Sequence, residues 1–203
     1  MMPMYHRLVI PFKTLLLVVA FLTALLPGCS TEPKEPLPVL GSVDIPYTFT
    51  NQDGAAVSQS IFSGAVYVAD FFFTSCPSIC PLMKSQMLRV YEAFSSQDDV
   101  LLLSHSIDPD HDTVEVLHDY AQRLGISSNR WHMVTGPKKD IYDTAHHYML
   151  AAKEDKQAPG GFIHSGSFCL VDRSGKIRGY YRGTEEESVD QLIEDIKSLL
   201  NES

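Results

Sequence analysis

The chain has 203 residues, of which 44% are hydrophobic and 20% are charged. This is the composition of an ordinary globular protein, and it excludes wholesale disorder, collagen-like repeats and a multi-pass membrane protein. The net charge is −9 and no run of Lys or Arg stands out, so a nucleic-acid partner is excluded as well. Four cysteines are too few for a disulfide scaffold, and each is therefore considered by its position.

The N-terminus has the features of an export signal. Two cations and no acid precede an apolar run over 15–26, which is too short for a transmembrane helix but fits the core of a secretory signal. The run ends in Leu26-Pro27-Gly28-Cys29, which resembles a bacterial lipoprotein cleavage site. We therefore expect residues 1–28 to be a lipoprotein signal peptide and Cys29 to carry the lipid. A plain signal with a spare thiol at Cys29 is the alternative.

The segment after the lipidation site is short and rich in proline. Residues 29–40 are expected to form an extended tether, and residues 41–203 a single domain with a substantial core. Such a chain is exported and held to a bacterial membrane by its lipid, with the domain in the periplasm or at the cell surface.

The rest of the chain shows strand patterns alternating with helix patterns. Strands are indicated by short runs rich in β-branched and aromatic residues, and helices by apolar residues recurring every three or four positions. In chain order, the patterns predict a hairpin over 47–57, a strand over 65–73, a helix over 82–94, a strand over 100–107, a helix over 112–124 with a capping-box start at Asp112, a strand over 131–134, a helix over 137–149, a hairpin of strands 168–171 and 177–181, and a helix over 187–200.

This order of elements predicts the fold class. A βαβ unit followed by ββα is the thioredoxin arrangement, and an extra helix and strand between them lengthen it as in peroxiredoxins. We therefore expect an α/β, thioredoxin-like single domain with a peroxiredoxin-type insertion, in which helices flank a central mixed sheet. Another α/β sandwich is the alternative.

Two cysteines, Cys76 and Cys80, lie where the first buried strand meets its helix. Ligands gather at the carboxyl ends of strands in open α/β sheets. Pro81 predicts that the regular helix begins there, so that both thiols lie at a helix N-terminus that favours thiolates. The pair can form a disulfide, and two thiolates are a soft ligand set that suits copper(I) or zinc. Two ligands are rarely enough, so a third is expected elsewhere.

Among eight histidines, His164 differs from the others by its place. It lies in a glycine-rich loop over 160–166, just before the last hairpin, and in a thioredoxin arrangement that loop packs beside the cysteine turn. On position alone, a solvated or hydrogen-bonded side chain is the simpler interpretation. The fourth cysteine, Cys169, lies in an apolar strand and is expected to be a small buried hydrophobe rather than a redox group.

Three motifs in order resemble the signatures of the Sco/SenC copper proteins, over about residues 40–200. They are Phe-x-Thr-x-Cys-Pro-x-x-Cys-Pro at 72–81, Ser106-Ile107-Asp108-Pro109 followed by Asp112-Thr113, and His164-Ser165 followed by Asp172 to Gly175.

The resemblance implies a membrane-anchored thioredoxin fold that binds one copper ion per chain through Cys76, Cys80 and His164. It implies a role in building the dinuclear copper site of cytochrome c oxidase, with the copper-site subunit of that enzyme, or another exported copper protein, as partner. A disulfide between Cys76 and Cys80 removes both thiolate ligands, so redox state gates copper loading.

The sequence departs from the family pattern at two positions beside the ligands. Ser75 replaces a frequent His, and Ile163 replaces a common Asp before the ligand His. Because neither is a ligand in the family, we expect effects on affinity rather than on copper binding itself. Asp108 is a candidate for a residue that contacts and orients the ligands without binding the metal itself. Asp70 is another, provided it is a buried carboxylate with a partner rather than a strand-edge residue near solvent.

Several functions compete over the use of the two thiols. The first is a copper chaperone, which is a carrier more than an enzyme. The second is a thiol-disulfide oxidoreductase, in which Cys76 and Cys80 are the catalytic pair. The third is a peroxidase, which needs an Arg and a Thr placed to activate the peroxide. Thr74, however, lies two residues before Cys76 rather than three, and Arg130 and Arg173 are uncommitted. A structural disulfide or a structural zinc site is the remaining alternative.

Overall fold

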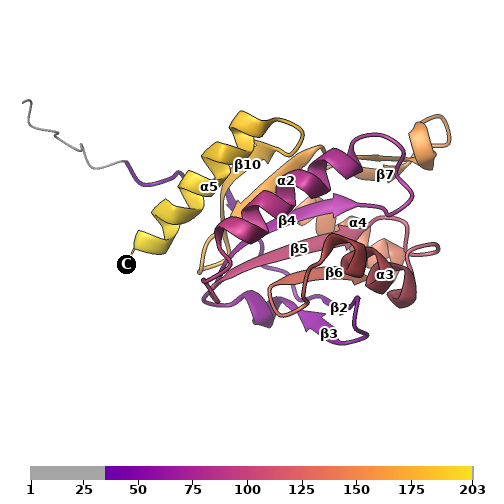
Figure 1. Cartoon of the computed structure of the whole chain (residues 1–203), viewed down its shortest axis with the longest axis horizontal. Coiled ribbons are helices and arrows are strands. Elements are labelled where there is room, and N and C mark those ends of the chain that lie inside the picture. Colours follow the sequence, from indigo (N-terminus) through magenta and orange to yellow (C-terminus); the bar gives the residue numbers. More distant parts are fainter. Residues whose placement is uncertain (1–34, 203) are drawn as a thin grey trace, which may run out of the picture. The chain divides into compact units, whose positions relative to one another are not determined.

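The fold is organised around an eight-stranded mixed sheet, as a computed structural model shows for residues 35–202 (Figure 1). The strand order is β1-β10-β9-β4-β5-β6-β2-β3. The strands of this sheet are β1 (Gly41–Ser42), β2 (Thr48–Asn51), β3 (Ala56–Ser58), β4 (Val66–Phe72), β5 (Val100–Ser106), β6 (Trp131–Thr135), β9 (Ser167–Val171) and β10 (Lys176–Arg182). A separate two-stranded sheet pairs β7 (Ala152–Glu154) with β8 (Phe162–His164).

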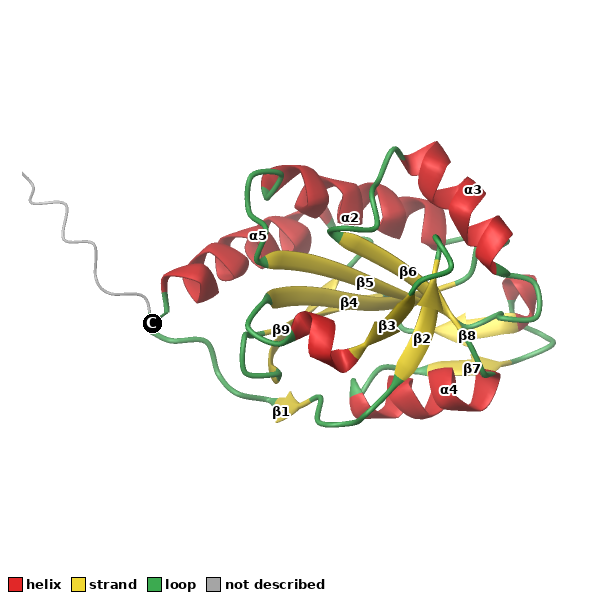
Figure 2. Cartoon of the chain, turned by 90° about the horizontal axis from the view of Figure 1, so that it is seen from below, coloured by secondary structure: helices red, strands yellow, loops and turns green. Residues whose placement is uncertain are grey.

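The centre of the sheet consists of β4, β5 and β6, which are mutually parallel. Every residue of these three strands is buried, because helices cover both faces of the sheet. The helices α2 (Cys80–Ala93), α3 (Val114–Leu124) and α5 (Glu186–Asn201) lie on one face, and α4 (Lys138–His147) lies on the other (Figure 2). The thioredoxin-like α/β prediction, a single domain with a flanked mixed sheet, is confirmed.

Most of the predicted elements are present, but the helices start one or two residues from the predicted positions, and two of these shifts lie at the site. The helix expected from Pro81 begins one residue earlier, at Cys80, because a proline in the first helical turn removes no intrahelical hydrogen bond. The helix expected from Asp112 begins at Val114, and Thr113 caps it by accepting from the Val116 amide. Asp112 is instead committed to other partners, described below.

The structure also holds strands that the sequence patterns did not indicate. β1 adds a two-residue edge to β10, and β7 and β8 have three residues each. His164, expected in a loop, is the last residue of β8. Strands this short carry too few residues to show a period of two.

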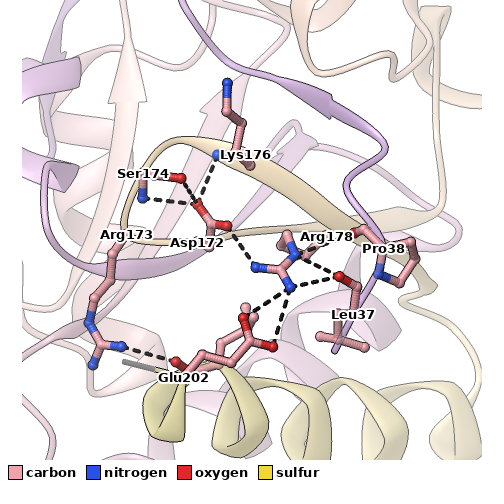
Figure 3. A network of polar contacts seen from close by, with 9 residues as sticks. Leu37, Pro38, Asp172, Arg173, Ser174, Lys176, Arg178 and Glu202 are labelled. Carbon is pink, nitrogen blue, oxygen red and sulfur yellow. Dashed lines mark hydrogen bonds and ion pairs between the residues drawn. The ribbon is translucent and has the colours of Figure 1, made fainter. Parts of the chain in front are cut away.

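At one end of the sheet, Arg178 on β10 holds the chain that leads into β1 (Figure 3). Its guanidinium, almost fully buried, donates to the carbonyl of Leu37 at 2.7 Å and pairs with Asp172 at 2.8 Å and with Glu202 at 3.0 Å. The described part of the predicted tether, residues 35–40, has no helix or strand. The N-terminal half of β4 lies at this end, and its carboxyl end, which leads to the cysteines, lies at the other.

The predicted signal peptide and Cys29 lie outside the described residues. In the part of the chain that the structure covers, no helix is at once long enough and apolar enough to cross a bilayer.

Candidate metal centre

Cys76 and Cys80 lie in the turn that joins β4 to α2. The Cys76 amide donates to the carbonyl of Phe73, and Cys80 is the first residue of α2, with Ile79 as its N-cap. Cys76 is 8% exposed and Cys80 only 1%, so the two sulfurs are nearly enclosed. Both lie at the carboxyl end of a central parallel strand, where an open α/β sheet gathers its ligands.

His164 reaches this turn from the end of β8. Its Nε2 lies 3.1 Å from the Sγ of Cys80, and its Nδ1 lies 3.0 Å from the carbonyl oxygen of Ser165. A carbonyl only accepts, so Nδ1 carries the proton and the lone pair of Nε2 is directed at the sulfur. This is the tautomer in which Nε2 can bind a metal ion.

Aromatic packing fixes the segment that carries His164. Phe73, which directly follows β4, contacts the ring of Phe162 at 5.1 Å between centroids and meets His164 edge-on at 6.0 Å. Gly160 allows this approach: its φ is +75°, and a Cβ there would lie 2.7 Å from the Phe73 ring. The sequence patterns did not reveal this contact, although Gly160 and Gly161 marked an unusual backbone.

The donor atoms of Cys76, Cys80 and His164 all lie within 4.8 Å of one another. Two sulfurs on opposite sides of a metal ion, each at about 2.3 Å, are about 4.6 Å apart, so the group fits one ion with small side-chain adjustments. Two thiolates and an imidazole form a soft set suited to copper. The three residues can therefore hold one copper ion.

The two thiols differ in their acidity. Burial alone would raise the pKa of the Cys76 thiol, but hydrogen bonds from the Ser78 amide and from Cys80 outweigh it and lower that pKa. Burial raises the pKa of the Cys80 thiol to about 12. Burial also lowers the pKa of His164, which keeps its imidazole neutral and able to coordinate.

Asp112 anchors the cysteine turn from the β5–α3 connection. Its carboxylate is fully buried and accepts from the Thr74 amide at 3.0 Å, the Thr74 hydroxyl, the Ser106 hydroxyl at 2.6 Å and His111 Nδ1 at 2.9 Å. Thr74 lies two residues before Cys76, so this carboxylate fixes the start of the turn. The position of Asp112 before a helix predicted a cap, and the sequence pattern did not indicate this role.

The two carboxylates proposed to support the ligands have different surroundings. Within residues 35–202, no hydrogen bond joins the Asp108 carboxylate to Cys76, Cys80 or His164, and its support of the ligands stays a prediction. Asp70 is fully buried, and Lys84 of α2 contacts both of its oxygens, at 2.8 and 3.1 Å. Asp70 is therefore a buried carboxylate with a partner, not a strand-edge residue near solvent.

A cavity of about 290 Å³ on the side of α3 is lined in part by both cysteines. It gives an incoming group a route to the thiols that does not pass through His164. The residues that line it are Thr74, Cys76, Cys80, Pro81, Lys84, Tyr120, Arg123 and Leu124.

The remaining candidates of the sequence lie away from this chemistry. Cys169 is fully buried in β9, as expected of a small hydrophobe. Arg130 donates to the carbonyls of Tyr91 and Phe94, and Arg173 pairs with Asp99. Both arginines, which the peroxidase interpretation took as uncommitted, are therefore engaged elsewhere, and neither is available to activate a peroxide at Cys76.

Comparisons with known proteins agree on one family. The SCO1/SenC family model matches residues 39–201. The chain is 35% identical over 155 residues to a Bacillus subtilis protein named SCO1 protein homolog, covering 75% of this chain and 80% of that protein.

Two solved structures extend this likeness to the fold. One is a SCO1/SenC family lipoprotein from Bacillus anthracis, 30% identical with a TM-score of 0.74, covering 84% of this chain and 100% of that one. The other is BsSco, described as a Sco family cytochrome c oxidase assembly protein with a disulfide switch, 32% identical with a TM-score of 0.72 and covering 83% and 100%. By sequence, fold and motif order, the chain belongs to the SCO1/SenC family.

Proposed function

We propose that this protein binds one copper(I) ion through Cys76, Cys80 and His164 and delivers it to the copper site of cytochrome c oxidase. The observation that carries the proposal is the convergence of two thiols and one imidazole within 4.8 Å. The chain belongs to a family that includes a cytochrome c oxidase assembly protein, and this supports cytochrome c oxidase as the client. The copper ion is cargo here, and the protein supplies the soft donors that hold it.

The geometry favours transfer over permanent storage. Three protein donors leave a coordination position open, and a client ligand can approach through the cavity on the α3 side, which both cysteines line. A client can then replace the donors one at a time. Oxidation of Cys76 and Cys80 to a disulfide removes two of the three donors, so a loaded site requires both thiols reduced.

The same proposal includes export and a lipid anchor at Cys29. The cleavage motif before Cys29 and the likeness to a family lipoprotein support it. A tether from Cys29 to the segment held by Arg178 keeps the domain close to the membrane that holds the client.

Copper transfer to a client tests the function. The protein is loaded with copper(I) under anaerobic conditions and mixed with the copper-free, reduced copper-site domain of a cytochrome c oxidase subunit. We expect copper to appear in the client after separation. The Cys76→Ser/Cys80→Ser variant, which has the same shape without the thiols, is expected to transfer none. Retention of all copper by the wild-type protein in the presence of excess client would contradict delivery.

One observation favours a second function, thiol-disulfide oxidoreduction. The pKa of Cys76 is lowered and Cys80 lies beside it, an arrangement that suits attack on a disulfide followed by resolution. In that reaction the protein dithiol becomes a disulfide and the client disulfide becomes a dithiol. Rapid reduction of the oxidised client by copper-free protein, lost in Cys76→Ser, would favour this function.

A further inference from the structure

A buried ion pair lies behind the two thiols, and the proposed function does not use it. Lys84 is one helical turn after Cys80 on α2 and is 1% exposed. Its ammonium donates to both oxygens of Asp70 and to the hydroxyl of Ser104, and lies 4.0 Å from the centre of the Phe72 ring. These contacts fix the position of the charge.

The pair has a defined orientation toward the site. Lys84 lines the cavity that both cysteines share, and Asp70, among the described residues, does not line it. Asp70 also accepts from the hydroxyl of Ser104, which in turn accepts from the indole of Trp131 at 3.0 Å. The negative end is therefore held in the sheet, and Lys84 lies on the side of the cavity that the two cysteines line.

The charge of a loaded site depends on the ion it holds. A monovalent ion with two thiolates and a neutral imidazole has a net charge of −1, whereas a divalent ion with the same donors is neutral. Burying a net charge is costly unless an opposite charge lies near it. The ammonium of Lys84 supplies that charge for the monovalent complex and gives the neutral complex no comparable benefit.

We propose that Lys84, oriented by Asp70, makes this site selective for a monovalent copper(I) ion over a divalent ion. The inference rests on the proposed copper site. Arg123 also lines the cavity, but it is exposed, with its guanidinium 5.5 Å from the Tyr120 ring, so water and salt screen its charge. Lys84 thus acts through its field on the complex and is a positioning residue, not a ligand.

The test compares two metals on one protein. Association constants for copper(I) and for zinc(II), a divalent ion that cannot be reduced here, are measured by competition with chromophoric chelators under anaerobic conditions. The ratio of the two constants is decisive. Both constants refer to the same metal-free protein, so any change in the protonation of its donor groups affects them equally and cancels in the ratio. In the variant Asp70→Asn/Lys84→Met we expect the ratio to fall on the order of fivefold, given the Coulomb energy at an effective dielectric near 20.

A matched control removes the same two charges from the surface. Lys139 and Asp143 form an exposed ion pair on α4, so Asp143→Asn/Lys139→Met is expected to leave the ratio unchanged. The buried double variant is expected to fold, since apolar or neutral groups of similar size often replace a buried ion pair without loss. Its melting temperature checks this.

A second variant keeps the test decisive if the double variant does not fold. Lys84→Gln retains a donor to Asp70 but removes the cation, and we expect the ratio to fall at least as far. An unchanged ratio in a folded variant, or an equal loss of affinity for both metals, would overturn the proposal, because an equal loss indicates a purely structural role. Failure of the wild-type protein to bind copper(I) at all would instead reject the proposed function.

Discussion

The Nε2 of His164 lies 3.1 Å from the Sγ of Cys80, although the two residues are 84 positions apart in the chain. Their elements share no backbone ladder: Cys80 begins α2, whereas β8 pairs with β7 in a sheet of its own. The ladder between β4 and β9, in which Ala69 faces Cys169, brings the segment before β9 to the carboxyl end of β4, and side-chain packing then sets the third donor against the thiols. The contact between Phe73 and the Gly160 turn is the part of that packing most open to test.

Gly160→Ala is expected to displace His164. The substitution forces a Cβ to within 2.7 Å of the Phe73 ring at a residue whose φ is +75°. We expect a stability loss of about 1–3 kcal/mol and a weaker affinity for copper(I), measured by thermal unfolding and chelator competition. Gly161→Ala is the matched control, because φ is also positive there but the space is open. Equal loss of copper affinity in both variants would show that backbone strain, not the Phe73 contact, is responsible.

Asp112→Asn is expected to loosen the cysteine turn. The substitution replaces one acceptor oxygen with an NH₂ group, which then faces either the Thr74 amide and the Ser106 hydroxyl or the Thr74 hydroxyl and His111 Nδ1. We expect a loss of about 2 kcal/mol in the free energy of unfolding and a several-fold weaker affinity for copper(I). Denaturant unfolding and chelator competition measure the two effects.

Asp108→Asn is the companion variant and tests the sequence-based prediction for that residue. Asp108 lies four residues before Asp112, and the two substitutions change charge and shape in the same way. If Asp108 supports the ligands, its variant weakens copper(I) binding as Asp112→Asn does. Wild-type affinity would remove Asp108 from the site and leave Asp112 as the supporting carboxylate.

Cys76 is expected to be the more reactive thiol. Its pKa is lowered, whereas burial raises that of Cys80 to about 12, and only the thiolate is a good nucleophile. With iodoacetamide at pH 8, mass spectrometry of the reduced, copper-free protein should find Cys76 modified at least about tenfold faster than Cys80. Cys169, fully buried in β9, is the internal control and should react only on unfolding. Faster modification of Cys80 would reverse the assignment of the attacking sulfur.

His105 makes stability depend on pH. Burial lowers its pKa from 6.5 to about 4, so between these values the unfolded chain binds a proton that the folded chain does not. Stability is therefore greatest above pH 6.5 and falls as the pH drops toward 4, by about 3 kcal/mol from this residue.

The variant His105→Leu should lose most of that pH dependence. Its side chain is apolar, and in the described structure the His105 Nε2 has no hydrogen-bond partner to replace. Denaturant unfolding at pH 7 and pH 4.5 measures the difference, with the exposed His146→Leu as control. If the free energy of unfolding of His105→Leu falls between pH 7 and pH 4.5 as much as that of the wild type, other groups cause the acid sensitivity.

Local patterns were sufficient to predict most of the fold. Strand β4 is apolar along its length except at Asp70, because both of its faces are buried, and such a run is visible without knowledge of its neighbours. The place of Cys76 and Cys80 followed from the same logic, since a strand that passes into a helix marks the edge where ligands gather.

What the sequence patterns missed depends on contacts between distant residues. β8, which carries His164, and its partner β7 are too short to show periodicity. Contact with Phe73 places His164 instead. Asp112 precedes a helix and so fitted a cap, although its carboxylate accepts from Thr74 instead. The partner of Asp70 could not be found either, because a lysine on an otherwise ordinary helix face gives no sign that it is buried.

The most direct test of the metal centre is a copper(I) titration of the reduced protein beside His164→Ala. We expect one ion per wild-type chain and an affinity at least about tenfold weaker in the variant, with the melting temperature of the copper-free protein unchanged. His146→Ala, an exposed histidine on α4, should bind copper as the wild type does. Wild-type affinity in a folded His164→Ala protein would contradict the three-donor site.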